Sequence, residues 1–269
     1  MAVEMTIDLS EFAGFPVWLN AAEITLAFGA GVTSEPMTQR RIADIREMLP
    51  DPHVTGPDPL YSIYMDLKVP GLTDVLNARG LSFGAVVDAP GTIGTEYVRS
   101  QGHTHSSPSG STIPYLEIYE FWFGTGAVYL QDRAEPETDE IYLVNVEPGD
   151  KLIIPPGWVH IAVNSGSTAL AFGALYASDA ELIYDGLRAM NGAAWRILAD
   201  GSFEMNQRYN APPTPLVRAA AEYPKAGIRR DIPIPVQAEK QQNSFDYVVD
   251  PENHATIWQT VIDDLREQT

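Results

Sequence analysis

Two histidines separated by one residue, His103 and His105, have the spacing that most directly suggests chemistry in this chain. In an extended strand, residues i and i+2 point to the same face, so the two imidazoles would converge on one point. Imidazoles placed in this way can bind a metal ion. The chain holds five histidines, so a His-x-His pair is weak evidence when it is taken alone. Further ligands are needed before a metal site is predicted.

Such ligands lie downstream of the histidine pair. Glu117 and Glu120 belong to the run YLEIYEFW, and His160 follows the turn Pro155-Pro156-Gly157. The two glutamates are three residues apart, so they point to opposite faces of a strand and only one can point inward. The chain has no cysteine, which leaves histidine and carboxylate as its strong metal ligands. Three imidazoles and one carboxylate suit one divalent ion of iron, manganese, zinc, nickel or copper.

Short β-strands are the elements that must position these residues. From about residue 60 the chain consists of apolar or alternating runs, which are LYSIYMDL, LSFGAVVD, TEYVRS, YLEIYEFW, AVYLQD, EIYLVNV, KLIIP, VHIAVN and TALAFGALY. Turn signals such as Pro90-Gly91 and Pro148-Gly149-Asp150 separate the runs. The spacing leaves no room for crossover helices, so it predicts antiparallel strands in a jelly roll or barrel over roughly residues 60–178.

The flanks of this core have a different character. Apolar residues at helical spacing predict one helix within residues 38–49, a second in AELIYDGLRAM after Tyr176, and a terminal helix in IWQTVIDDLREQ. Three regions follow from these patterns. They are an N-terminal arm with one helix (1–59), a barrel that holds the metal and substrate site (60–190), and a C-terminal extension with a terminal helix (191–269).

The charge and the N-terminal sequence limit the partners of the chain. Seventeen Lys and Arg residues against thirty-six Asp and Glu residues give a net charge of -19, which disfavours nucleic acid and anionic membranes. The N-terminal segment has neither a basic region nor an apolar one, and no apolar stretch is long enough to span a bilayer. We therefore expect a cytoplasmic protein whose partner is a small molecule.

The motifs occur in an order that resembles a known family. The order G-x-H-x-H, then E, P-G-D, P-x-G and H is the double motif of cupin barrels, and the surrounding sequence closely resembles the archaeal-type cupin glucose-6-phosphate isomerases. In that family a P-G-x-x-G-x-E segment leads into G-H-x-H, and residues 90–96 lead into residues 102–105 here. The resemblance spans roughly residues 60–190. It implies an all-β cupin barrel, an antiparallel double-sheet jelly roll with N-terminal and C-terminal additions, and a homodimer.

The resemblance also implies roles for individual residues. The family pattern E-[VI]-Y matches residues 117–119, which selects Glu117 over Glu120 as the metal ligand. The implied metal ligands of one divalent ion are His103, His105, Glu117 and His160. The implied catalytic residues are Glu117 and Tyr119, and the implied substrate-binding residues are Tyr64, Ser100, Gly102, Tyr176 and Tyr184.

The implied function is metal-dependent aldose–ketose isomerisation of a hexose that carries an anion at C6, with glucose 6-phosphate to fructose 6-phosphate as the first choice. Four positions depart from the family pattern, namely Ala85 and Val86 in place of threonines, Gln101 in place of a frequent lysine, and Leu182 in place of a histidine. These departures keep a sulfonated hexose such as sulfoquinovose as an alternative substrate. A cupin iron dioxygenase and a non-catalytic sugar-binding cupin are the alternatives from other classes.

Overall fold

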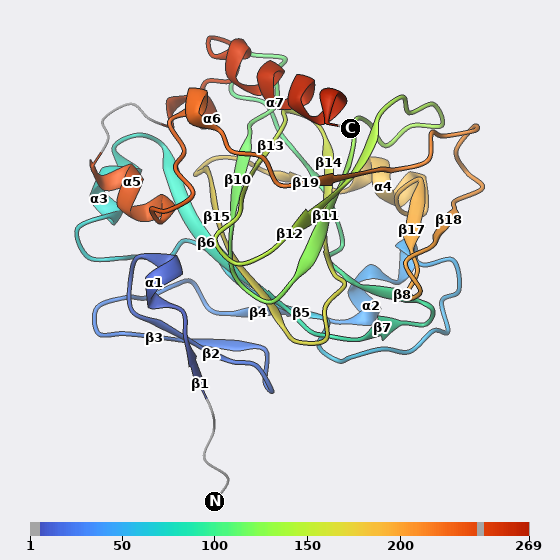
Figure 1. Cartoon of the computed structure of the whole chain (residues 1–269), viewed down its shortest axis with the longest axis horizontal. Coiled ribbons are helices and arrows are strands. Elements are labelled where there is room, and N and C mark those ends of the chain that lie inside the picture. The colour runs from blue at the N-terminus through green and yellow to red at the C-terminus, as the bar shows by residue number, and fades with distance from the viewer. Residues whose placement is uncertain (1–5, 241–244, 269) are drawn as a thin grey trace, which may run out of the picture.

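Two six-stranded sheets form the centre of the computed structural model, which describes residues 6–240 and 245–268 (Figure 1). The first sheet is antiparallel throughout and has the order β13 (Lys151–Ile154), β10 (Glu117–Phe123), β15 (Leu170–Ala177), β6 (Leu81–Asp88), β5 (Tyr61–Tyr64) and β4 (Thr38–Arg40). The second sheet has the order β19 (Leu216–Ala219), β12 (Ile141–Val146), β11 (Gly126–Gln131), β14 (Val159–Asn164), β8 (Glu96–Arg99) and β7 (Thr92–Ile93). Its strands are antiparallel except for the parallel pair of β12 and β19. This double-sheet jelly roll confirms the predicted cupin fold.

Shorter elements surround the two sheets. The remaining strands are β1 (Thr6–Asp8), β2 (Val17–Asn20), β3 (Thr25–Phe28), β9 (Thr104–His105), β16 (Leu182–Ile183), β17 (Trp195–Ile197) and β18 (Phe203–Met205). The helices are α1 (Ser10–Ala13), α2 (Ile42–Ile45), η1 (Arg46–Met48), α3 (Thr73–Asn77), α4 (Asp185–Ala189), η2 (Pro224–Ala226), α5 (Ile234–Lys240), α6 (Asp246–Val249) and α7 (Ala255–Glu267). No helix in the described ranges is long and apolar enough to cross a membrane.

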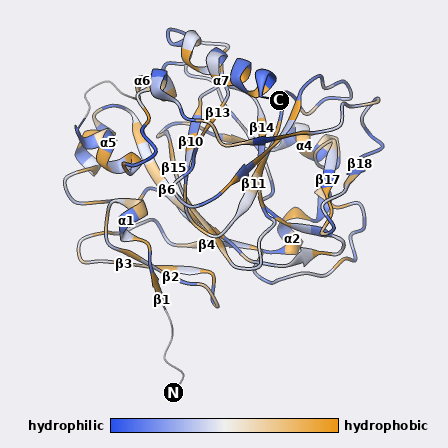
Figure 2. Cartoon of the chain, viewed as in Figure 1, coloured by the Kyte–Doolittle hydropathy of each residue, from blue (hydrophilic) through white to orange (hydrophobic). Residues whose placement is uncertain are grey.

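Both faces of the first sheet are buried. On β10, Phe121 packs on Phe172 inside the jelly roll, at 5.3 Å between ring centroids. On the other face Trp122 contacts Phe15 of the N-terminal region, at 6.0 Å. The N-terminal and C-terminal segments therefore cover the outer face, which explains why the strands read as nearly continuous apolar runs. Figure 2 shows this hydrophobic colouring along the strands, whereas α7 is largely hydrophilic and buries only one face.

Three boundaries differ from the sequence prediction. Residues 38–40 form strand β4 rather than the start of a helix, because they pair with β5 along the sheet edge. Residues 182–183 likewise form β16, which pairs with β9, and the following helix begins only at Asp185. The sheets also extend beyond residues 60–190, since β4 and β19 lie outside that range. In each case pairing with a distant strand outweighs the local helical pattern or the loop-like composition.

Candidate metal centre

Four side chains from adjacent elements gather inside the jelly roll. One ligand atom from each of His103, His105, Glu117 and His160 lies within 4.8 Å of the others. Glu117 belongs to β10, His105 to β9 and His160 to β14. The ring centroids of His103 and His105 are 5.0 Å apart, so the two imidazoles converge as the i, i+2 spacing predicts.

Backbone pairing fixes the relative positions of two of the ligands. His103 and His160 form an isolated antiparallel bridge, with N···O distances of 3.4 and 3.2 Å in the two directions. Their Nε2 atoms lie 2.9 Å apart. Nδ1 of His160 lies 3.0 Å from the carbonyl oxygen of Trp158, to which a protonated Nδ1 donates. That hydrogen bond selects the tautomer whose Nε2 lone pair is free for a metal ion.

Glu117 provides the negative charge of the cluster. Its Oε2 atom lies 3.2 Å from Nε2 of His160, 3.5 Å from that of His105 and 4.0 Å from that of His103. The same oxygen is buried and has no hydrogen bond of acceptable geometry. A buried carboxylate oxygen that lies close to three imidazole nitrogens and has no hydrogen bond fits the role of a metal ligand.

The protonation states suit a cation. Burial lowers the pKa of His103 well below its usual value and lowers that of His105 to about 4. Burial would raise the pKa of Glu117, but contacts with His160 and His105 outweigh it and the pKa lies below its usual value. At neutral pH these two histidines are therefore neutral while Glu117 is ionised, as metal binding requires. The donor set fits a divalent ion with mixed nitrogen and oxygen ligands.

Glu120 lies on the opposite face of β10 and has a structural environment. It forms a buried ion pair with Lys151 at 3.1 Å and accepts the backbone N–H of Ile234 at 3.0 Å. Both charged side chains are almost fully buried beneath the C-terminal segment. The structure thus separates Glu117 and Glu120 by strand alternation, and only Glu117 faces the histidines.

A pocket of about 90 Å³ opens beside the cluster. Its lining comes from strands β5, β6, β10 and β15 of the first sheet, from β9 and β16, and from the segment that follows β8. Among the predicted substrate-binding and catalytic residues, its lining includes Ser100, Gly102, Glu117, Tyr119, Tyr176 and Tyr184. Within the described chain no lysine or arginine lines it.

The tyrosines of the pocket are held in defined positions. Tyr119 follows Glu117 on the same face of β10, and its hydroxyl interacts with that carboxylate. The ring centroid of Tyr184 lies 5.9 Å from that of His103. Tyr176 pairs with Glu117 across the sheet, and its hydroxyl accepts the backbone N–H of Asp66 at 3.1 Å. These three rings form an aromatic wall beside the candidate metal ligands.

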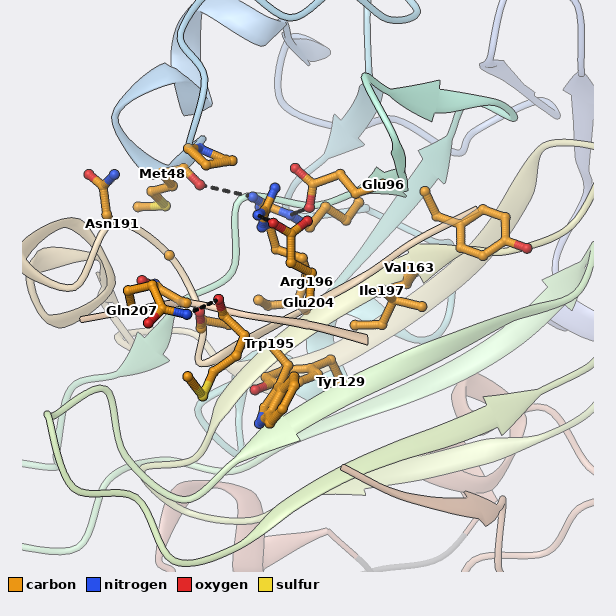
Figure 3. A pocket seen from close by; sticks show the side chains of 18 residues that line it. Met48, Glu96, Tyr129, Val163, Asn191, Trp195, Arg196, Ile197, Glu204 and Gln207 are labelled. Carbon is orange, nitrogen blue, oxygen red and sulfur yellow. Dashed lines mark hydrogen bonds and ion pairs between the residues drawn. The ribbon is translucent and has the colours of Figure 1, made fainter. Parts of the chain in front are cut away.

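A second cavity, of about 370 Å³, lies on the outer face of the second sheet (Figure 3). Its wall includes Tyr129 and Ile161, which pair across β11 and β14 and point away from His160. Its charged side chains pair with one another, since Arg99 contacts Glu96 at 3.1 Å and Arg196 contacts Glu204 at 2.6 Å. The cavity therefore has no unbalanced charge, and none of the four candidate ligands lines it.

The model of the family "Glucose-6-phosphate isomerase (GPI)" matches residues 39–214. The chain belongs to this family. The match includes all four clustered side chains and the whole pocket lining. It also includes both six-stranded sheets, except for the first residue of β4 and the whole of β19. It confirms the resemblance inferred from the motifs.

Curated members of the glucose-6-phosphate isomerase family are similar over the central part of the chain. A glucose-6-phosphate isomerase of Thermococcus litoralis is 36% identical over 100 residues, which cover 37% of this chain and 48% of the relative. Those of Thermococcus kodakarensis and Sinorhizobium medicae are 31% and 33% identical and cover 46% and 45% of this chain, or 61% and 52% of the relatives. The chain thus spans about half the length of the curated relatives it matches.

Solved structures of other proteins show limited similarity to parts of this chain. An oxalate oxidase in complex with glycolate is 20% identical, with a TM-score of 0.32 and coverage of 39% of this chain and 46% of that chain. A vicilin from Solanum melongena is 14% identical, with a TM-score of 0.32 and coverage of 45% and 30%. The fold assignment here rests on the strand order and pairing.

One substrate residue implied by the family resemblance is contradicted by the structure. Tyr64 points to the outer face of β5, where its hydroxyl accepts the backbone N–H of Leu26 at 2.7 Å. Tyr61 has the opposite parity on the strand, and it lines the pocket. The run LYSIYMDL contains both tyrosines, and because both faces of β5 are buried, its polarity does not reveal which one faces the site.

The four departures from the family pattern all lie at the pocket. Ala85, Val86, Gln101 and Leu182 are part of its lining. Leu182 pairs with His105 across β16 and β9, which places it next to a candidate metal ligand. Val86, Gln101 and Leu182 therefore bear directly on the substrate pocket, whereas Ala85 pairs with Tyr64 and its side chain points to the outer face.

Proposed function

We propose that the protein is a metal-dependent aldose–ketose isomerase of a hexose with an anion at C6, and that glucose 6-phosphate and fructose 6-phosphate are its first-choice substrates. The observation that carries the proposal is the cluster of three imidazoles and Glu117 at a buried pocket in a chain of this family. The names of the relatives support the choice of substrate. The expected homodimer and cytoplasmic location remain predictions.

The ligand set would hold one divalent ion of iron, manganese, zinc or nickel. When bound, such an ion acts as a Lewis acid that polarises a sugar carbonyl. His103, His105 and His160 supply neutral nitrogen donors, and burial keeps bulk water from competing with the sugar oxygens. The aromatic wall of Tyr119, Tyr176 and Tyr184 would position the sugar beside this site.

Isomerisation transfers hydrogen between C1 and C2. In the enediol route, Glu117 accepts the proton from C2 of the aldose and returns it to C1, while the proton of the C2 hydroxyl moves to O1. Glu117 is suited to this role because it is ionised, and as a candidate metal ligand it would act as the base once substrate binding displaces it from the ion. Tyr119 contacts the same carboxylate and would orient it. A hydride shift between C1 and C2 is the competing route, and the two differ in exchange with solvent.

Metal analysis followed by an isomerase panel tests the proposal. The panel contains glucose 6-phosphate, a 6-sulfonated glucose and glucose, each with and without chelator. His105→Asn should lose bound metal and activity, whereas His53→Asn changes an exposed histidine and serves as the matched control. Activity that survives complete removal of metal would refute metal dependence. Absence of deuterium at C2 of the aldose formed in D2O would refute the enediol route.

A sulfonated hexose is the second candidate substrate. The observation that favours it is the lack of lysine and arginine in the pocket lining of the described chain. A sulfonate carries one negative charge, whereas a phosphate monoester carries about −1.5 to −2 at pH 7, so it needs fewer cationic partners. Equal or faster turnover of glucose 6-phosphate would reject this candidate. Oxygen consumption without isomerisation would instead indicate a dioxygenase, and metal-free sugar binding a non-catalytic cupin.

A further inference from the structure

Among the described residues, the pocket lining has no cationic side chain that could bind the anion of the proposed substrate. Glu117 is the one acidic residue in its lining, and the described lining has no lysine or arginine. The chain as a whole has a net charge of -19, which repels anions at long range. A positively charged side chain just outside the lining would favour binding of a phosphate or sulfonate group, and Arg40 is placed to provide it.

Strand pairing places Arg40 on the pocket face of the first sheet. Strand β4 lies beside β5 at the edge of the first sheet (Figure 1). Arg40 of β4 pairs directly with Tyr61 of β5, which lines the pocket. Paired residues project to the same face, with roughly 4.5–5.5 Å between their Cβ atoms. Gln39 illustrates the alternation, because its side chain bonds Ser62 at 3.3 Å on the opposite face.

The Arg40 guanidinium has no ion pair or hydrogen bond within residues 6–240 and 245–268, although the residue is partly buried. Two other cations near the pocket have anionic partners. Lys68 contacts Asp66 at 2.6 Å, and Arg188, which lies over the Tyr184 ring, is 3.8 Å from Asp185. Of these three cations, Arg40 is the one without an anionic partner among the described residues. Asp88 also pairs with Tyr61, from β6, but burial raises the pKa of its carboxyl well above the usual value and so disfavours its charged form.

The electrostatic environment of Tyr61 reflects this placement. Burial raises the pKa of the Tyr61 phenol, and the positive charge of Arg40 opposes the rise. The Tyr61 hydroxyl also accepts the backbone N–H of Gln101, one of the residues that depart from the family pattern. Tyr61 therefore connects its strand partner Arg40 to Gln101 of the pocket lining.

We propose that Arg40 binds the C6 anion of the sugar and replaces the charge that the pocket lining lacks. The inference rests on the proposed function. A guanidinium suits this role because its planar set of N–H donors can bind two oxygens of a phosphate or sulfonate. Arg40 would thereby determine the preference for anionic over neutral hexoses.

Binding of unreactive hexitols tests the inference without turnover. Calorimetry would compare glucitol 6-phosphate, the corresponding 6-sulfonate and glucitol on the metal-loaded protein. Arg40→Gln should weaken binding of glucitol 6-phosphate by about tenfold to a hundredfold, as expected when a charge-assisted hydrogen bond is lost. Binding of glucitol should not change. Arg40→Lys should restore part of the affinity, because it keeps the charge and loses the planar geometry.

Arg41→Gln is the matched control. Arg41 is the neighbouring residue, is exposed and pairs with Asp58 at 2.6 Å, so its loss changes the net charge equally without affecting the proposed contact. Equal effects of the two variants, or equal weakening of glucitol and glucitol 6-phosphate by Arg40→Gln, would overturn the inference. A wild-type protein that binds glucitol 6-phosphate through Arg40 but isomerises no hexose would overturn the proposed function alone.

Discussion

Gly102 connects the backbone of the site to its chemistry, and its replacement by alanine makes a quantitative test. Gly102 has a φ of 77°, and a Cβ at this position would lie 2.5 Å from Cγ1 of Ile161 and 3.1 Å from Cδ1 of Leu187. The left-handed backbone costs an alanine about 1–2 kcal/mol. Insertion of a methyl group into a packed site costs about 1–3 kcal/mol more. Gly102→Ala should therefore lower the free energy of unfolding by about 2–5 kcal/mol.

The same substitution should weaken metal binding. Gly102 precedes His103, and Ile161 follows His160, so a shift that relieves the contact moves two of the four candidate ligands. These two histidines are also joined by their backbone bridge. We expect a loss of manganese or zinc affinity of about tenfold or more, similar to the loss of an outer contact that orients a ligand.

Gly201→Ala separates backbone strain from packing. Gly201 has a φ of 83°, but nothing lies within 4 Å of a Cβ built there. This control should lose about 1–2 kcal/mol, and its metal affinity should equal that of the wild type. Urea unfolding of the metal-free proteins and calorimetric titration with metal would measure both effects. Equal stability losses in the two variants, or unchanged metal affinity in Gly102→Ala, would refute the reasoning.

Three further predictions concern buried charge and metal binding. Burial raises the pKa of Asp88 well above 3.8, so the contribution of Asp88 to stability is present at low pH and is lost as the pH rises above 3.8. In urea unfolding, Asp88→Asn should therefore become increasingly more stable than the wild type from pH 4 to pH 8, and a pH-independent difference would contradict this. Burial raises the pKa of Glu120, the ion-pair partner of Lys151, to about 7. Lys151→Met should therefore lower the free energy of unfolding by about 3–5 kcal/mol at pH 8 and by clearly less at pH 5, where Glu120 is protonated. An equal loss at both pH values would reject the explanation. A hundredfold excess of divalent ion over its Kd should stabilise the wild type by about 2.7 kcal/mol in thermal unfolding, and His160→Asn should abolish this increase.

Local patterns in the sequence were sufficient to predict the central strands and the convergence of two candidate metal ligands. Each of the nine predicted runs corresponds to a strand of the two large sheets, because each combines apolar residues with a turn signal at its end. His103 and His105 were predictable from strand alternation, since their convergence depends on a spacing of two residues. The choice of Glu117 over Glu120 needed the family pattern, because both carboxylates lie in one apolar run and both are buried.

Elements that depend on distant partners were not predictable in the same way. Strands β4 and β16 are three and two residues long, and each exists because another strand pairs with it. The error at Tyr64 has a similar origin. The N-terminal sheet covers the outer face of β5, so both faces of β5 are buried. Its hydrophobic pattern therefore does not show which side chains point into the jelly roll. Arg40 was missed because its role depends on β4, which the helical pattern of residues 38–49 concealed.

The candidate metal ligands and the proposed anion contact lie on different strands, and this separation bears on how substrate preference can change. The ligands come from β9, β10, β14 and the backbone bridge of His103, whereas Arg40 and Tyr61 come from β4 and β5 at the far edge of the first sheet. The ligand geometry is fixed by the His103–His160 bridge and the burial of Glu117, neither of which includes Arg40. Substitution of Arg40 should therefore alter sugar discrimination at constant metal affinity. Loss of the bound metal on Arg40→Gln would show that the metal ligands and the anion contact are not independent.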